Sequence, residues 1–157
     1  MNLQIETYLA GLPVFGLRVL IVEDEKFHAE VLDKMLVVLG FKNIDHAYDG
    51  HEALKLAEEE PYHLVITDLD MPGMNGLTFA RTLRNNGQSD YAQVPLIMLS
   101  CHRDAENIKQ AHASGINQYI GKPFDILTLR EKILQVYADK PANIFAAHAR
   151  KAARRGK

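Results

Sequence analysis

The sequence predicts an α/β fold: a five-stranded parallel sheet with helices on both faces. Two observations predict it. Short apolar segments alternate with helical segments along the chain, five of each, as in proteins built from repeated strand–helix units. The first apolar segment, residues 17–22, is almost continuously apolar, which is typical of a strand buried on both faces. The crossovers between parallel strands are expected to be right-handed.

The first two strand–helix units span residues 17–61. After the strand at 17–22, apolar residues recur at helical spacing and Gly40 ends that helix as a C-cap; they are Val31, Leu32, Met35, Leu36 and Leu39. A second strand is expected at 44–48. Asp49, with Glu52 three residues later, marks the start of the next helix. Ala53, Leu54 and Ala57 form its buried side, and Pro61 ends it.

Three more units follow between residues 64 and 138. Strands are expected at 64–67, 96–99 and 117–120. A turn cluster at 71–76 precedes a helix at 77–84 that Asn75 caps, and Gly115 closes a helix at 105–114. Asp125 caps the last helix, whose buried side is formed by Ile126, Leu129, Ile133 and Tyr137.

The composition is that of a globular domain. The 157 residues are 47% hydrophobic and 24% charged, which excludes a disordered or fibrous chain. No apolar run is long enough to insert into a membrane. The single cysteine, Cys101, allows no intramolecular disulfide and fits a reducing compartment. Since no secretory signal is visible either, we expect a cytoplasmic protein.

Charged residues are unevenly distributed along the chain. Residues 139–157 contain six Lys/Arg and one Asp, a net +5, whereas the other residues contain twelve basic and nineteen acidic side chains, a net −7. We therefore expect an N-terminal extension at 1–16, one domain at 17–138 and a basic tail at 139–157. Nineteen residues cannot form a DNA-binding domain, so the tail is expected to be a solvated end and direct DNA binding is not expected.

Polar residues gather where the predicted strands end. Glu23 and Asp24 follow the first strand, Asp68 follows the third, Ser100 the fourth, and Lys122 the fifth. The carboxyl ends of parallel strands share one edge, where such folds bind their ligands. Taken singly, each acid is explained as a cap of the following helix. Together, clustered carboxylates repel one another and require a cation or raised pKa values.

Those side chains suit phosphoryl transfer to a carboxylate. Carboxylate oxygens at an edge open to water are ligands for Mg²⁺, with Mn²⁺ as a substitute. A carboxylate is already ionised at neutral pH and attacks phosphorus in line, while the metal and a lysine neutralise the charge on the phosphoryl oxygens. A serine hydroxyl donates a hydrogen bond to a third oxygen.

Residues 17–138 resemble the receiver domain of two-component response regulators. The resemblance is carried by the residue types and their order: Glu23-Asp24, Asp68, residues 71–76 (Met-Pro-Gly-Met-Asn-Gly), Ser100, Tyr119, Lys122, Pro123 and Phe124. It implies a flavodoxin-like fold with strand order 2-1-3-4-5. It also implies a phosphorylation-switched protein that accepts a phosphoryl group from a histidine kinase or a histidine phosphotransfer protein, rather than a turnover enzyme.

The resemblance assigns roles to matching residues. Asp68 is expected to be the phosphoacceptor and, with Asp24, to bind Mg²⁺ through its side chain, while Glu23 acts largely through water. Asp70 contributes its backbone carbonyl. Lys122 pairs with the phosphoryl group, and the Lys122–Pro123 bond is expected to be cis. Ser100, where threonine is common, and Tyr119 form the switch pair.

Asp70 and His102 occupy the two positions that influence phosphoryl lifetime in this family. His102 is also explained as a surface histidine on the loop that leads into the helix at 105–114. Signalling is expected through a downstream protein, or through homodimerisation, at the surface formed by the helix at 105–114, the last strand and the last helix.

Two alternatives remain at this point. The chain is either a stand-alone receiver or the receiver portion of a longer regulator. Asp68-Leu-Asp70 also resembles the motif of haloacid-dehalogenase-like phosphatases, although that family usually carries it on its first strand.

The N-terminal extension has the spacing of a short amphipathic helix, with apolar residues at Ile5, Tyr8, Leu9 and Leu12. We expect this helix to pack on the domain or on a second copy.

Overall fold

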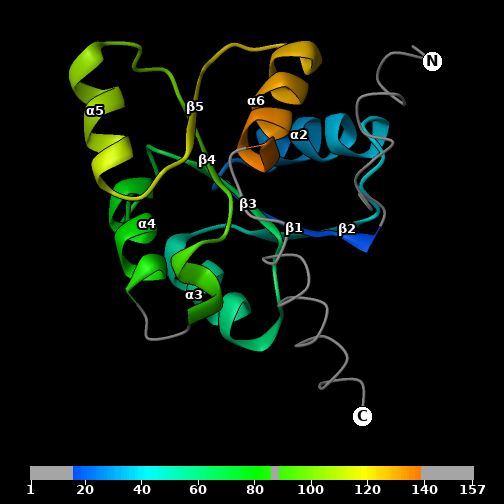
Figure 1. Cartoon of the computed structure of the whole chain (residues 1–157), viewed down its shortest axis with the longest axis horizontal. Helices are drawn as coiled ribbons and strands as arrows, with labels where there is room; N and C mark the ends of the chain where they lie inside the picture. The colour runs from blue at the N-terminus through cyan, green and yellow to red at the C-terminus, as the bar shows by residue number, and fades with distance from the viewer. Residues whose placement is uncertain (1–15, 86–88, 139–157) are drawn as a thin grey trace.

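The computed structural model describes residues 16–85 and 89–138, and every strand and helix predicted within them is present (Figure 1). The strands are β1 (Arg18–Val22), β2 (Asn43–Ala47), β3 (Leu64–Asp68), β4 (Leu96–Ser100) and β5 (Gln118–Gly121). The helices are α2 (Lys26–Val38), α3 (Gly50–Glu59), α4 (Gly76–Arg84), α5 (Ala105–Ala113) and α6 (Ile126–Ala138), with a short 3₁₀ helix η2 (Ser89–Ala92).

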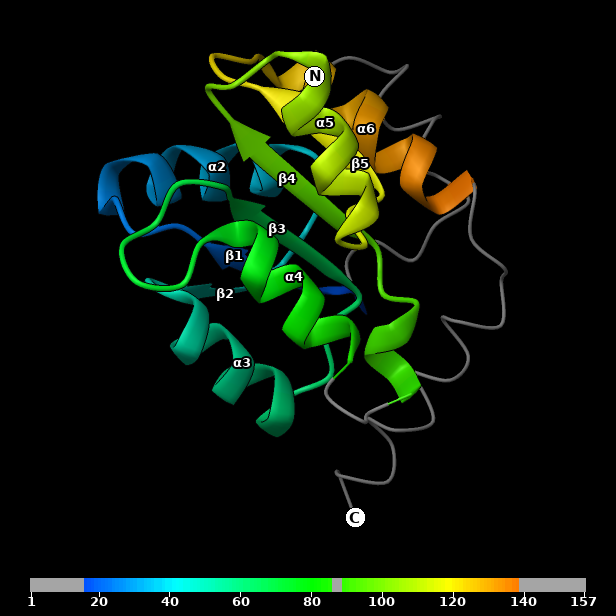
Figure 2. The same cartoon turned by 90° about the vertical axis from the view of Figure 1, so that its left-hand side faces the viewer.

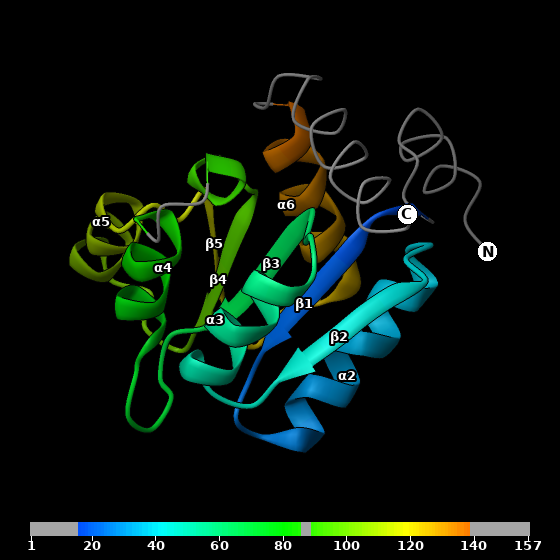
Figure 3. The same cartoon turned by 90° about the horizontal axis from the view of Figure 1, so that it is seen from below.

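The strands form one parallel sheet in the order β2-β1-β3-β4-β5, which confirms the predicted fold class and strand order (Figure 3). The order reverses between β1 and β3, because the chain adds β2 on one side of β1 and the later strands on the other. Val22 of β1 pairs with Thr67 of β3. The carboxyl ends of these two strands therefore lie side by side at the switch point, where ligands bind in such sheets.

Two apolar layers cover the sheet. Alternate residues of each strand point to opposite faces, so Val19 and Ile21 pack with α2 and α6, whereas Leu20 and Val22 pack with α3, α4 and α5. Figure 2 shows α3 and α4 side by side along the second face. The buried strands fix the edge at which the polar residues gather.

Local signals position the helices as predicted. The side chains of Asp49, Asn75 and Asp125 each accept a hydrogen bond from a backbone N–H three residues later, at Glu52, Thr78 and Thr128. Gly40 and Gly115 follow α2 and α5 with φ angles of 108° and 99°, a conformation in which glycine has no steric penalty.

The structure corrects several details. Leu17 and Tyr48 lie outside β1 and β2, because the paired ladder begins at Arg18 and Asn43 and ends at Val22 and Ala47. Val31 was predicted on the buried stripe of its helix and is 38% exposed. The buried residues of α2 are Ala29, Leu32 and Leu36, and this narrower face turns Val31 toward solvent.

The helix η2 was not predicted. It contains Tyr91, which forms a buried tyrosine network: the Tyr91 hydroxyl donates to the carbonyl of Glu60 at 2.6 Å and accepts from the N–H of Tyr62 at 3.3 Å. These contacts join residues about thirty positions apart, which no local pattern reveals.

No helix in the described part of the chain is long and apolar enough to cross a membrane. The predicted N-terminal helix and the basic tail lie outside the described residues.

Candidate functional site

Three carboxylates meet at the switch point of the sheet. Glu23 and Asp24 follow β1, and Asp68 is the last residue of the neighbouring β3. The N–H of Glu23 still donates to the carbonyl of Ala47 at 3.0 Å, which keeps the acidic pair in line with the ladder. One oxygen from each of the three carboxylates lies within 4.8 Å of the other two. The sequence prediction that these acids converge is correct.

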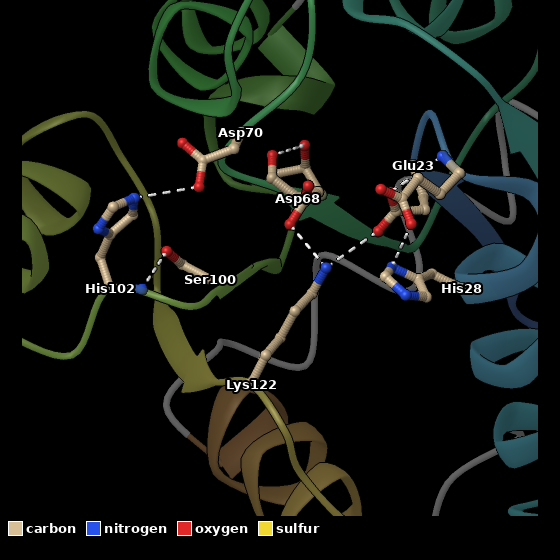
Figure 4. A network of polar contacts seen from close by, with 9 residues as sticks. Glu23, His28, Asp68, Asp70, Ser100, His102 and Lys122 are labelled. Carbon is tan, nitrogen blue, oxygen red and sulfur yellow. Dashed lines mark hydrogen bonds and ion pairs between the residues drawn. The ribbon is translucent and has the colours of Figure 1, made fainter.

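Lys122 reaches this cluster from the end of β5. Its backbone N–H donates to the carbonyl of Ser100 at 2.7 Å, which fixes the start of the side chain. Its Nζ lies 2.9 Å from Oδ1 of Asp68 and 3.2 Å from Oε2 of Glu23 (Figure 4). The Lys122–Pro123 peptide bond is cis.

Burial makes the charges of this cluster costly. Glu23 and Asp68 are almost fully buried, and burial is the main cause that raises the pKa of each. Asp68 adds repulsion at Glu23, and Asp70 and Asp24 add it at Asp68, while Lys122 opposes the rise at both. At Lys122 burial favours a lower pKa, but the hydrogen bond and charge of Asp68, followed by Glu23, outweigh it and raise the pKa. One ammonium therefore leaves the three acids incompletely neutralised.

The donor set fits a hard divalent cation. Carboxylate oxygens are ligands that Mg²⁺ prefers, and Asp24 is only partly buried, so the site is accessible to a hydrated ion. The raised pKa values of Glu23 and Asp68 are a second indication, because a bound cation would favour the ionised form of both groups. Sulfur and imidazole ligands, which favour zinc, are not part of this cluster within the described residues.

Ser100 and Tyr119 lie on the side of Asp68 that is away from Glu23 and Asp24, because β4 and β5 follow β3 in the sheet on the side opposite β1. Ser100 ends β4 and is buried, and its Oγ accepts from the N–H of His102 at 3.0 Å. Tyr119, on the adjacent β5, is also buried, and its hydroxyl donates to the carbonyl of His102. Both predicted switch residues thus hold the same loop residue.

Two contacts beside the site, one between His102 and Asp70 and one between Gly76 and Asp68, were not predicted from the sequence. Nε2 of His102 lies 3.1 Å from a carboxylate oxygen of Asp70, so the two positions expected to influence phosphoryl lifetime form an ion pair when the histidine is protonated. Figure 4 shows the Asp70 side chain turned toward His102 rather than toward Lys122. Gly76 was placed only in a turn, yet a Cβ there would lie 2.3 Å from the carbonyl oxygen of Asp68.

A comparison with protein families decides the class of this site. The family model of the response regulator receiver domain matches residues 19–134. The chain belongs to this family.

Relatives agree with that assignment. The probable chemotaxis protein CheY of Rhizobium etli is 36% identical over 121 residues, which are 77% of this chain and 92% of that protein. The response regulator TrrA of Thermotoga maritima, solved in complex with Mg²⁺–BeF, is 32% identical with a TM-score of 0.67, covering 76% of this chain and 98% of that one. The receiver domain of the sensor histidine kinase PA1611 of Pseudomonas aeruginosa has magnesium coordinated in its active-site cleft; it is 30% identical with a TM-score of 0.67, covering 76% and 95%.

The protein is a CheY-like response regulator receiver: a phosphoacceptor, not a turnover enzyme. The phosphatase alternative is therefore wrong. Glu23, Asp24 and Asp68 form an acidic Mg²⁺ site, as in the magnesium-bound receivers. Membership of the family also implies a histidine kinase as a partner.

Proposed function

We propose that Asp68 is the residue that accepts the phosphoryl group. The observation that carries this is its position: it ends the central strand β3 within the acidic cluster, and its Oδ1 is closer to Nζ of Lys122 than the Glu23 carboxylate is, at 2.9 Å against 3.2 Å. An attacking carboxylate needs a cation on each side, because the transferring group is itself anionic. Glu23 and Asp24 supply one through the metal they bind, and Lys122 is the other.

The transfer needs no general base. A carboxylate oxygen of Asp68 forms a bond to phosphorus as the phosphorus–nitrogen bond of a phosphohistidine breaks, and the leaving imidazole takes up a proton from solvent. Mg²⁺ held by Glu23, Asp24, Asp68 and the backbone carbonyl of Asp70 would neutralise charge on the phosphoryl oxygens. Lys122 keeps its proton and holds a second oxygen, and the Ser100 hydroxyl donates to a third. The donor is a histidine kinase or a histidine phosphotransfer protein.

The test is phosphorylation with Mg²⁺ and a small phosphodonor. The wild type is expected to gain one phosphoryl mass that hydroxylamine removes, and Asp68→Asn is expected to gain none. Asp70→Asn is the matched control, since its side chain points toward His102, and it should still be labelled. Labelling of Asp68→Asn at the wild-type rate would refute the assignment.

We further propose that Ser100 and Tyr119 transmit phosphorylation to the surface formed by α5, β5 and α6. Ser100 accepts from the N–H of His102, and its hydroxyl also bonds the Tyr119 hydroxyl. A phosphoryl oxygen on Asp68 would offer the Ser100 hydroxyl hydrogen a new, charged acceptor. Movement of Ser100 toward that oxygen draws the His102 loop with it. Since the Tyr119 hydroxyl is bound to the carbonyl of that loop, the ring has to follow or break its bond, which gives two discrete arrangements.

This switch is tested by Tyr119→Phe, which removes only the hydroxyl, and by Ser100→Ala. Asp68 should remain a phosphoacceptor in both. Phosphorylation should change hydrogen exchange in α5 and β5 of the wild type and much less in the variants. A wild-type response in both variants would contradict the mechanism. The downstream partner is then a protein, or a second copy, that favours the phosphorylated arrangement of this surface.

The remaining assignments rest on the family and the composition. We propose that residues 17–138 are the working receiver, flanked by the extension at 1–16 and the basic tail at 139–157. We propose a cytoplasmic location, supported by the single cysteine and by the membership in a family of signalling receivers.

A further inference from the structure

A groove opens beside the phosphoacceptor site on the α2 face of the molecule. Its volume is about 380 Å³, and it lies between α2 and the segment that leads from β5 into α6. Glu23 and Lys122 border it on the site's side, whereas Phe27, Val31 and Phe124 contribute apolar walls. The groove is therefore an apolar surface that reaches the rim of a charged site.

The apolar surface continues along α2. Phe27, Val31 and Val38 are 72%, 38% and 55% exposed. Their spacing of four and seven residues places them on one side of the helix. Scattered exposed apolar residues need no explanation, but apolar residues that follow one side of a helix into a groove form a strip typical of a surface that something covers.

We propose that the N-terminal segment of this chain, residues 1–15, covers the strip and the groove. The segment leads into Gly16, immediately before β1. Helix α2 follows β1 and runs back, so that its last residues lie at the edge of the sheet where β1 begins (Figure 1). Its apolar residues Ile5, Tyr8, Leu9 and Leu12 recur at helical spacing. A surface of this kind is their natural complement, since an amphipathic helix is stable only when its apolar face is buried.

The length of the segment fits the distance. A helix over residues 2–12 is about 15 Å long, and the thirteen residues of α2 extend about 20 Å. Residues 13–15 suffice to turn the chain at the edge of the sheet. Leu12 would then pack near Val38, and Ile5 near Val31 and Phe27, so that the start of the segment reaches the groove.

The cover has a regulatory consequence that rests on the proposed function. A protein that presents a phosphohistidine to Asp68 has to contact the rim at Lys122, which the groove borders. The N-terminal segment would compete with such a donor. It would not compete with a small phosphodonor, which needs only the charged cluster.

Cys101 reports whether the groove is covered. It is the only cysteine in the sequence, its side chain lines the groove, and it is exposed in the described part of the chain. The rate at which the full-length protein reacts with N-ethylmaleimide, followed by mass, measures this access. We expect deletion of residues 2–12 to raise that rate about tenfold, the ratio for a groove that is open about a tenth of the time.

Point variants keep the test independent of the deletion. Leu9→Asn, on the apolar side of the predicted helix, should also raise the rate, and Thr7→Asn, on the opposite side, should not. Equal rates in the wild type, the deletion and Leu9→Asn would overturn the proposal. A protection that disappears on dilution would overturn it as well, because the segment would then cover a second copy. Phosphorylation of Asp68 by a small donor is measured in the same samples, so failure of the proposed function is distinguished from failure of the cover.

Discussion

Gly76→Ala tests whether the backbone of Asp68 is held by close packing. Gly76 begins α4, and its N–H donates to the carbonyl of Leu69 at 2.9 Å. An added Cβ would lie 2.3 Å from the carbonyl oxygen of Asp68 and 2.9 Å from Cε of Met98. The methionine can move, but the carbonyl belongs to β3. The new methyl group therefore has to displace either α4 or Asp68, the proposed phosphoacceptor.

Two effects of this substitution have opposite signs. Helix propensity favours alanine over glycine by up to about 1 kcal/mol. Overpacking a rigid site costs about 1–3 kcal/mol. Because the added methyl group would contact a backbone oxygen at such a short distance, we expect a cost near the upper end of that range. The close contact therefore decides the result. Subtracting the propensity gain from a packing cost of about 3 kcal/mol leaves a net loss of about 2 kcal/mol. In a domain of this size 1 kcal/mol corresponds to about 2–4 °C, so we expect the melting temperature to fall by roughly 4–8 °C.

The measurement is thermal unfolding by circular dichroism, together with the rate of phosphorylation by a small donor. The rate should also fall, because displacement of Asp68 moves its carboxylate relative to Lys122. Gly16→Ala is the control: it adds the same atom where nothing lies within 4 Å. An unchanged or higher melting temperature in Gly76→Ala would refute the packing argument.

Three further substitutions test the charged groups. Burial raises the pKa of Asp68, so the folded state binds its proton more tightly than the unfolded chain. Without metal, Asp68→Asn should therefore be more stable than the wild type at pH 7, and calorimetry should show this gain in stability vanishing below about pH 4. Saturating Mg²⁺ should reduce the gain, because it stabilises the folded wild type. Asp24→Ala should weaken Mg²⁺ binding in titration calorimetry, whereas the remote Glu131→Ala should not. Arg84→Met removes the guanidinium donors to the backbone carbonyls of Gly115 and Tyr91, so urea unfolding should show a loss of about 2–4 kcal/mol.

Much of the fold was predictable because its signals are local. Asp49, Asn75 and Asp125 cap their helices with their own side chains, and such caps are visible as residue types a few positions from an apolar stripe. The convergence of Glu23, Asp24 and Asp68 was predictable for a different reason: a parallel sheet brings every strand's carboxyl end to one edge. Neither inference required knowledge of side-chain packing.

The features that escaped prediction depend on distant segments. Gly76 reads as a turn residue, and only the fold reveals the carbonyl of Asp68 against it. His102 reads as a surface histidine; half of its side chain is exposed, yet its backbone joins Ser100 to Tyr119. Val31 matches the periodicity of its helix and still faces outward, because the sheet contacts only a narrow face of α2.

The charges at the site connect metal binding to the proposed switch. With all groups ionised, Glu23, Asp24 and Asp68 outnumber Lys122 by two charges, and one divalent cation balances them. Phosphorylation removes the charge of the Asp68 carboxylate and adds about −1.5 to −2 on the phosphoryl oxygens, so the balance becomes negative again. Neither Lys122, already bound between two acids, nor a single metal can compensate for all of it. The excess negative charge attracts further hydrogen-bond donors. Ser100 is the buried last residue of β4, the strand paired with the one that carries Asp68, and its hydroxyl is such a donor. The imbalance at the metal site would thus drive the movement of Ser100, which makes the proposed switch a consequence of the electrostatics of the site.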